Sequence, residues 1–271
     1  MIKDITIGQY FPGNSFVHKL DPRAKLIITV LFMVLIFMCK NFYSLAFMLV
    51  LLTAVIAVSK VPFKMFFKSL KPIVPIVIFT TILNIFYVTG GTVLFSWRFI
   101  TISTKGIFTA LFMAVRIVAL IISSSLLTYT TTPTMLTDGL ERLLSPLNKL
   151  HIQVHTLAMI MTLALRFIPT LIEEVDKIMN AQKARGADLE SGNILQRAKA
   201  LVPILVPLFV SSIRRAYELA FAMECRCYSG GEGRTRMKKM KFGLNESVTV
   251  LLAVVSIAAV VLINNLFGKI I

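Results

Sequence analysis

Acidic residues are scarce in this chain of 271 residues, which has 13 Asp and Glu against 29 Lys and Arg and a formal net charge of +16. Such an excess of positive charge suits nucleic acid, anionic lipid or an acidic protein partner. Nucleic acid is the least favoured of the three, because long apolar runs separate the basic residues. Charged residues of both signs make up only 15% of the chain, which excludes an ordinary soluble domain.

Residue types that build active sites, metal centres and cross-links are few as well. Cys225 and Cys227 would form a strained disulfide, and Cys39 lies in an apolar run, so we expect free thiols and no oxidised scaffold. His151 and His155 have helical spacing, but two ligands do not complete a metal site. The chain has no GxxxxGK[ST] nucleotide-binding loop and no paired catalytic carboxylates. We therefore expect no enzyme activity, no cofactor and no bound metal.

Apolar residues are abundant, at 56% of the chain with a mean hydropathy of +0.81, which is typical of an integral membrane protein. The first twenty residues lack the apolar core of a cleavable signal peptide, so the first hydrophobic segment is also expected to be the first crossing. A crossing needs about 20 mostly apolar residues, or fewer with flanking Lys or Arg. Five segments meet this condition: residues 26–39, 42–59, 73–88, 107–129 and 248–267.

Lys and Arg flank these segments unevenly, and cytoplasmic loops are enriched in them. Four basic residues precede the first crossing and four follow the second, whereas the opposite connections hold few: the enriched sets are Lys3, Lys19, Arg23 and Lys25, and Lys60, Lys64, Lys68 and Lys71. This pattern predicts a multi-pass protein of the cell membrane with its N-terminus in the cytoplasm and its C-terminus outside. Five crossings agree with that arrangement.

A long segment of mixed charge and helical periodicity separates the fourth crossing from the last. Residues 154–184 have apolar positions at helical spacing and a proline, Pro169, that is expected to kink the helix. Residues 201–213 are apolar but short for a crossing, and a crossing there would place many basic residues outside. We expect this stretch to lie along the membrane surface. The predicted domains are residues 1–130 (four transmembrane helices), 131–245 (cytoplasmic amphipathic helices) and 246–271 (a closing transmembrane helix).

One charge, Arg116, falls in the middle of the fourth crossing, where an unpaired charge is costly. A structural hydrogen-bonding role is favoured over a mechanistic one. The alternative function that this residue suggests is a self-contained secondary transporter or channel. Such a protein would have an internal duplication of its crossings and several embedded ionisable groups, and neither is visible in the sequence.

A loose repeat in the basic half of the chain gives the strongest candidate site. Residues 181–186, Ala-Gln-Lys-Ala-Arg-Gly, return 41 residues later as residues 222–227, Ala-Met-Glu-Cys-Arg-Cys. Each Arg is expected near the C-terminal end of an amphipathic helix, where the helix dipole alone favours a cation. The docking hypothesis adds that each planar guanidinium binds carboxylates in a partner's groove. The candidate docking residues are Ala184, Arg185, Gly186, Cys225, Arg226 and Cys227.

Four short motifs are spread along the chain: residues 8–15 (Gly-Gln-Tyr-Phe-Pro-Gly-Asn-Ser), 18–25 (His-Lys-Leu-Asp-Pro-Arg-Ala-Lys), 166–169 (Arg-Phe-Ile-Pro) leading to 184–186, and 222–228. Through these motifs the chain resembles, along essentially its full length, the EcfT family, the transmembrane scaffolds of energy-coupling factor (ECF) vitamin transporters. The order, spacing and membrane context of the motifs make the match specific. One departure is Cys227, where many members have Gly.

This resemblance implies an all-α integral membrane protein with five transmembrane helices plus cytoplasmic amphipathic coupling helices. It also implies that Arg185 and Arg226 dock into two ABC-type ATPase subunits, and that a separate membrane-embedded substrate-binding subunit completes the importer. The chain would then be a non-catalytic coupling subunit for the uptake of vitamins or other micronutrients. Which ATPase meets which arginine, the transported compound and the stoichiometry are not contained in the sequence.

Overall fold

A computed structural model describes residues 10–88, 90, 92–97, 100–150, 153–187, 193–230 and 243–267. The chain forms two compact units. The first in size, which we call the membrane unit, comprises residues 8–140 and 240–271. The second, the coupling unit, is built on residues 141–239. Residues 1–9, among them Lys3, lie outside the described residues.

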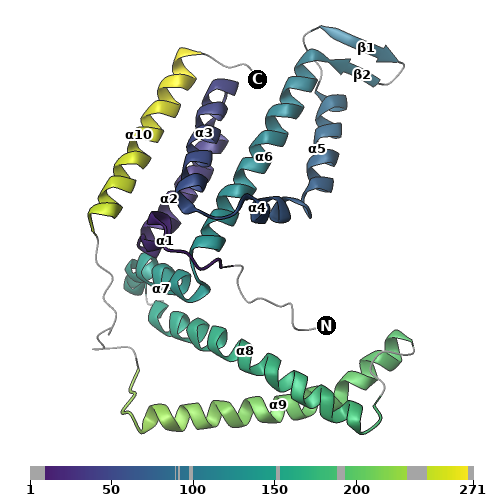
Figure 1. Ribbon diagram of the computed structural model, residues 1–271, viewed down its shortest axis with the longest axis vertical. Coiled ribbons are helices and arrows are strands. Elements are labelled where there is room, and N and C mark those ends of the chain that lie inside the picture. The colour runs from purple at the N-terminus through teal and green to yellow at the C-terminus, as the bar shows by residue number, and fades with distance from the viewer. Residues whose placement is uncertain are drawn as a thin grey trace. The chain divides into compact units, whose positions relative to one another are not determined.

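The membrane unit is a helical bundle with one small hairpin (Figure 1). Its elements in chain order are α1 (Phe16–Lys19), α2 (Pro22–Met38), α3 (Phe42–Ser59), α4 (Phe63–Leu70), α5 (Val74–Tyr87), β1 (Val93–Trp97), β2 (Ile100–Ser103), α6 (Thr104–Thr130), α7 (Pro133–Leu144) and, near the C-terminus, α10 (Leu244–Leu266). The predicted all-α fold is confirmed. The antiparallel hairpin β1–β2 was not predicted from the sequence.

Local sequence explains where the first helices begin and end. Asp21 is the N-cap of α2, because its carboxylate accepts from the backbone N–H of Arg23 at 2.9 Å, and Pro22 occupies the first turn, where its missing N–H costs nothing. The two residues between the predicted crossings 26–39 and 42–59 include Asn41, which is fully buried at the N-cap position of α3; its backbone N–H donates to the Ser44 hydroxyl at 3.4 Å. The side chains of Asp21 and Ser44 thus satisfy backbone N–H groups that would otherwise be unpaired inside an apolar bundle.

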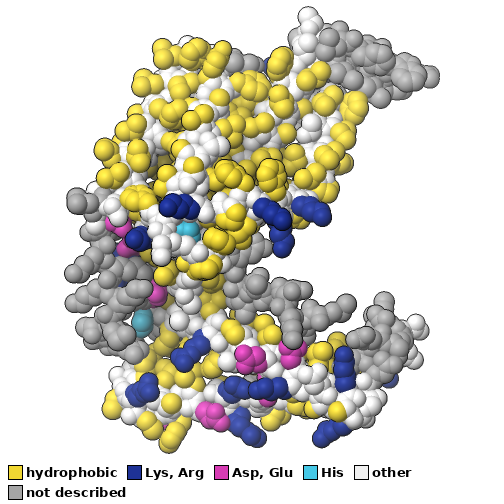
Figure 2. Space-filling model, viewed as in Figure 1, with side chains coloured by type: hydrophobic (Ala, Val, Ile, Leu, Met, Phe, Trp, Pro, Cys, Tyr) yellow, Lys and Arg dark blue, Asp and Glu magenta, His cyan; other side chains and the backbone are white. Residues whose placement is uncertain are grey.

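The long helix α6 is the centre of the membrane unit and packs against α2, α3, α4 and α5. Ile36, Met48 and Phe112 are nearly inaccessible in the core. Gly106 lets α6 approach the end of α5 closely, because a Cβ there would lie 2.8 Å from the carbonyl oxygen of Val88. Large apolar side chains on the outside remain exposed, and yellow side chains cover this unit in Figure 2. A helical bundle with an apolar outer surface is suited to contact with lipid.

Length and composition mark five helices among the described residues as able to cross a membrane, the number predicted. The membership differs, however, since these are α3, α6, α8 (Val154–Ala184), residues 199–224 of α9 (Ile194–Glu224) and α10. Helix α2 has 17 residues and is slightly too short to be counted among them. Helix α5 is long enough to cross a membrane only together with α4, from which it is bent by 62°. The mean hydropathy of the most apolar stretch divides these helices into two classes. It is 2.2 to 2.5 in α3, α6 and α10, but only 1.5 in α8 and 1.4 in α9.

The coupling unit contains the end of α7, a short 3-10 turn η1 (Ser145–Leu150), and the two long helices α8 and α9. The apolar stretch 201–213, expected to be a short helix, is the middle of the 31-residue α9, with Pro203 and Pro207 inside it. The shortness of the apolar stretch 201–213 therefore does not by itself exclude that α9 crosses the membrane. Asn193 and Gln196 form a capping box that starts α9, because the Gln196 side chain accepts from the Asn193 N–H at 3.0 Å.

Candidate functional site

The first Arg-bearing helix end closes α8 with a Schellman motif. The N–H of Gly186 donates to the carbonyl of Lys183 at 3.0 Å, and the N–H of Ala187 donates to that of Gln182 at 3.0 Å. Gly186 has a φ of +83°, the left-handed conformation that glycine adopts without steric cost. The chain therefore turns away sharply after Arg185, and both Ala184 and Arg185 are exposed.

The second helix end closes α9 with the same hydrogen bonds, displaced by 41 residues. The N–H of Cys227 donates to the carbonyl of Glu224 at 2.8 Å, and that of Tyr228 donates to Met223 at 3.0 Å. Cys227 has a φ of 56° and so occupies the left-handed position that Gly186 holds in the first copy. Cys225, Arg226 and Cys227 are all exposed. The sequence repeat is thus also a structural repeat, with each Arg one residue before the left-handed residue.

A residue with a Cβ in the left-handed region is strained by about 1–2 kcal/mol relative to glycine. We expect Cys227→Gly to stabilise the end of α9 by about 1 kcal/mol, because it removes this strain without losing a contact. Hydrogen exchange followed by mass spectrometry should show roughly fivefold slower exchange at the amides of Cys227 and Tyr228. Gly186→Ala is the matched reverse change, with open space around it but a φ of +83°. It should speed hydrogen exchange at the amides of residues 186 and 187. If both variants changed the exchange rate in the same direction, backbone strain at Cys227 would be refuted.

Helices α8 and α9 pair antiparallel through polar contacts at a constant register. Glu174 on α8 forms an ion pair with Arg215 on α9 at 2.7 Å and accepts a hydrogen bond from the Ser211 hydroxyl at 3.4 Å. Nearer the end of α8, the Gln182 side chain donates to the carbonyl of Pro203 at 3.3 Å. That carbonyl is at the level of Pro207, whose ring leaves a carbonyl without its helical donor. The two helices are therefore held at defined positions along their length.

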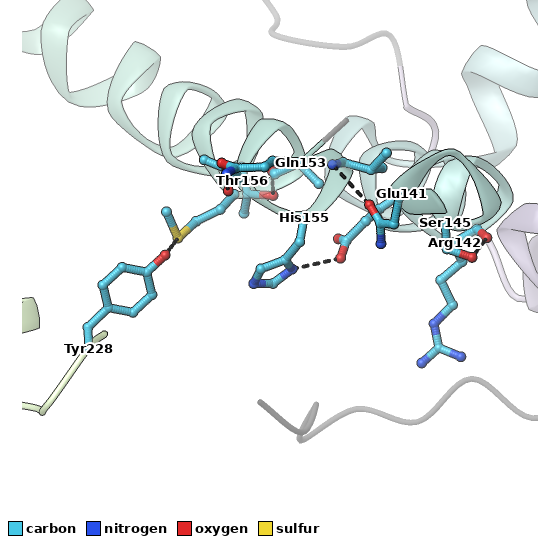
Figure 3. A network of polar contacts seen from close by, with 12 residues as sticks. Glu141, Arg142, Ser145, Gln153, His155, Thr156 and Tyr228 are labelled. Atoms are coloured by element: carbon cyan, nitrogen blue, oxygen red, sulfur yellow. Dashed lines mark hydrogen bonds and ion pairs between the residues drawn. The ribbon is translucent and has the colours of Figure 1, made fainter. Parts of the chain in front are cut away.

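The segment that follows α9 returns to the beginning of α8 (Figure 3). The Tyr228 hydroxyl donates to the Met159 sulfur at 3.2 Å. Close by, the His155 ring lies 2.9 Å from the Glu141 carboxylate, which ties α8 to α7. His155 thus has a structural partner. His151, the other residue of the predicted i,i+4 pair, lies outside the described residues, and no cluster of three metal-ligating side chains occurs in the described parts of the chain.

The antiparallel pairing places the two arginines at opposite ends of the coupling unit. Each helix has 31 residues and is about 45 Å long. Arg185 follows the last residue of α8, close to the Gln182–Pro203 contact with α9, and Arg226 follows the end of α9, two residues before Tyr228 contacts Met159 in the first half of α8. Figure 1 shows the two helices running in opposite directions and crossing. Neither arginine has an ion-pair partner in the part of the chain that the structure describes. Two separate, exposed cationic helix ends are therefore available to partners.

Arg116, the other candidate, lies inside the membrane unit and contacts the turn between α2 and α3. Its guanidinium donates to the carbonyl oxygen of Cys39 and lies 4.6 Å from the centre of the Phe112 ring. A cation over an aromatic face is stabilised by the ring quadrupole. Among the described residues, no carboxylate pairs with Arg116. This geometry matches the structural hydrogen-bonding role favoured from the sequence.

The N-terminal motif has a role that sequence reasoning missed: it ties three helices of the membrane unit together. Lys25 is only 5% exposed, and its ammonium donates to the carbonyls of His18 (3.1 Å) and Thr130 (2.9 Å) and to the Thr131 hydroxyl (3.3 Å). It thus holds the C-terminal end of α6. No helix-period pattern signals the contacts with Thr130 and Thr131, because they join residues about a hundred positions apart.

Two further contacts complete this N-terminal anchor. The backbone N–H of Asp21 donates to the Glu246 carboxylate at 3.2 Å, which joins α2 to α10. The His18 ring donates to the carbonyl of Phe11 at 3.0 Å and lies 2.6 Å from the Ser15 hydroxyl. Burial lowers the pKa of His18, and a neutral ring fits one donated and one accepted hydrogen bond. Most polar groups of the N-terminal motif therefore form hydrogen bonds within the chain.

Comparison with known proteins agrees with this architecture. Residues 13–240 match the CbiQ family, described as cobalt transport protein. The energy-coupling factor transporter transmembrane protein EcfT of Clostridium kluyveri is 55% identical over 99% of this chain and 100% of its own length. The EcfT proteins of Ruminiclostridium cellulolyticum (52% identical, 98% of this chain and 100% of the relative) and Bacillus subtilis (48% identical, 94% and 97%) are similar over comparable lengths.

A match of this extent covers both units and both Arg-bearing helix ends. The chain belongs to the EcfT family of energy-coupling factor transporter transmembrane proteins, a group within the CbiQ transport family.

Proposed function

We propose that this protein is the non-catalytic coupling subunit of an ECF-type ABC importer for vitamins or other micronutrients. Two partner ATPases bind the exposed helix ends at Arg185 and Arg226, and a separate membrane-embedded subunit binds the substrate. The observation that carries the proposal is the pair of matched Schellman caps, each presenting an exposed Arg at an opposite end of one antiparallel helix pair. A guanidinium at such a sharp helix end is accessible to carboxylates in a partner's groove.

The linkage between α8 and α9 supports transmission of motion between the two docking points. ATP binding would draw the two ATPases together and load the helix ends in opposite senses. The Glu174–Arg215 ion pair and the Gln182–Pro203 hydrogen bond lie between those ends and would resist or redirect the movement. The contact between α8 and α9 is long and mostly apolar, with few polar contacts. Such a helix pair is suited to switching between two alternative arrangements.

The outer face of α9 supports contact with the substrate-binding subunit or the membrane. Val202, Leu205, Phe209 and Ile213 recur at intervals of three and four residues and are exposed, whereas Ile204 faces inward and is 4% exposed. A one-sided apolar stripe of this kind is expected to be covered in the working assembly. The shift of α9 would then reach the substrate-binding subunit directly.

The proposed topology keeps the N-terminus and the coupling unit in the cytoplasm and the C-terminus outside. Helices α8 and α9 have the lowest mean hydropathy of the five long apolar helices, and the adjacent residues Arg214 and Arg215 lie inside α9. A surface position satisfies these charges, whereas a full crossing would bury them. The predicted division at residues 1–130, 131–245 and 246–271 is retained in this proposal.

The alternative of a self-contained transporter or channel rests on Arg116. Its contacts with Cys39 and Phe112 are those of a residue that stabilises a helix turn. The described residues of the bundle offer no chain of ionisable groups along α6. The coupling function is therefore the better supported of the two.

Co-expression and purification test the proposal. The tagged full chain, extracted in mild detergent, should retain two nucleotide-binding proteins and a small membrane protein, and the assembly should hydrolyse ATP. The chain purified alone should neither hydrolyse ATP nor transport after reconstitution. A single polypeptide that transports by itself would refute the proposal.

A further inference from the structure

A basic patch on α4 has no role in the coupling proposal. It consists of Lys64 and Lys68 on α4, Lys71 at the C-cap of α4 and Lys60 at the C-cap of α3, which we together call the α4 patch, and all four side chains are exposed. Lys64, Lys68 and Lys71 are spaced by four and three residues and so share one helix face. None of the four has an ion pair with a described residue. The sequence offers none nearby, because no Asp or Glu occurs between residues 22 and 137.

Aromatic side chains accompany these lysines on the exposed surface of α4. Phe63 and Phe67 are spaced by four residues and are 59% and 71% exposed. The opposite face of α4 is fixed, because Phe66 is buried edge-on against Tyr129 with ring centres 5.5 Å apart. The Tyr129 hydroxyl also bonds the backbone of α4 at Met65, at 3.1 Å. The exposed face therefore has a fixed orientation and presents charge and aromatic surface side by side.

The geometry of the chain places this face at an apolar boundary. Helices α4 and α5 are bent by 62° relative to each other, so they cannot both follow the bilayer normal. Helix α5 carries exposed Ile76 and Phe79 and is the apolar partner of the pair. In Figure 2, dark-blue side chains gather along the edge of the membrane unit at which α4 lies in Figure 1, below the yellow outer surface. An α4 close to the membrane plane has its lysines at the headgroups and its phenylalanines at the acyl boundary.

We propose that the α4 patch is a binding site for anionic phospholipid headgroups. Lysine ammonium groups bind phosphate, and the exposed phenylalanines bind the adjoining acyl chains, a combination that an acidic protein does not offer. The patch also satisfies the general bias of basic residues toward the cytoplasmic side. That bias requires only charge, whereas a lipid site requires discrimination between anionic and zwitterionic headgroups and sensitivity to salt.

The test measures lipid retention by the purified full chain in nonionic detergent. Native mass spectrometry compares phosphatidylglycerol with phosphatidylcholine of the same acyl chains. The triple variant K64Q/K68Q/K71Q should lose affinity for phosphatidylglycerol by at least about tenfold, since each lysine at an anionic surface contributes about fivefold. Phosphatidylcholine retention should not change. Raising the salt concentration should reduce the phosphatidylglycerol preference of the unmutated chain.

A charge-matched control is K149Q/K177Q/K183Q, which removes three exposed charges of the coupling unit that lie outside α9. It should retain the preference of the unmutated chain. The double variant F63S/F67S should weaken both lipids together. If the triple variant does not elute as a folded, monodisperse species in size-exclusion chromatography, the single variant K68Q and the salt titration test the same loss of phosphatidylglycerol preference. The proposal is overturned if the unmutated chain shows no preference for phosphatidylglycerol, if the control loses it equally, or if a polyglutamate peptide displaces the lipid.

Discussion

Arg185→Glu and Arg226→Glu are each expected to abolish assembly with one ATPase partner, and coupled transport with it. The carboxylate would repel the acidic groove that the guanidinium is proposed to enter. Loss of one partner of a buried charged hydrogen bond costs about 2–5 kcal/mol or more, so binding should weaken at least about 30-fold. Both side chains are exposed, so the fold should be unchanged. Co-purification of each ATPase and substrate uptake by reconstituted complexes measure the effect.

Arg214→Glu is the matched control for these variants. Arg214 is exposed on α9 and undergoes the same change of charge, but it does not lie at a helix end. It should therefore retain both ATPases. Arg185→Lys and Arg226→Lys should also be damaging, because lysine lacks the bidentate fork. Normal assembly and transport in both single variants and in the double variant would show that docking does not depend on these residues.

Lys25→Met is expected to destabilise the membrane unit by about 3 kcal/mol or more. The ammonium makes three hydrogen bonds in a nearly inaccessible site, and the thioether replaces none of them. The carbonyl of Thr130, at the end of α6, would be left without this donor, at about 1–3 kcal/mol for each unsatisfied buried group. A lower midpoint of thermal unfolding in detergent, together with proteolysis near residues 10–20, measures the loss.

Lys19→Met makes the same chemical change at an exposed lysine of the same motif. It should shift the midpoint little, because exposed single charges contribute within about 0.5 kcal/mol. Equal effects of the two substitutions would mean that Lys25 contributes only general charge, contrary to its observed contacts. A large effect of Lys25 alone would show that part of the N-terminal motif maintains the fold rather than contacting partners.

The features that the sequence predicted correctly depend on short stretches of chain. The break before α3 falls at Lys40-Asn41, between the predicted crossings 26–39 and 42–59, whereas α2 begins four residues before the predicted residue 26. The 41-residue repeat signalled two similar helix ends, and both adopt the same cap. Caps and periodicity act within four or five residues, so a linear pattern contains nearly all the relevant information.

The hairpin β1–β2 and the full length of α9 were missed for related reasons. A two-stranded hairpin has few residues and a weak alternating pattern, so a long apolar background conceals it. In α9, only the apolar stretch 201–213 was expected to be helical, yet the helix extends to both sides of it and continues through Pro203 and Pro207. Packing of Ile204 and the side-chain donor of Gln182 compensate where local propensity alone opposes the helix.

By itself, the sequence determined that this is a basic, helical membrane protein with two Arg-bearing helix ends and no nucleotide loop of its own. Only the tertiary structure decided that α8 and α9 run antiparallel, so that Arg185 and Arg226 lie at opposite ends of one unit. It also decided that Lys25 is buried and that Asp21 meets Glu246, 225 positions away. The physical reason is range: hydropathy and caps are local, whereas burial and ion pairing depend on which distant segments the fold brings into contact.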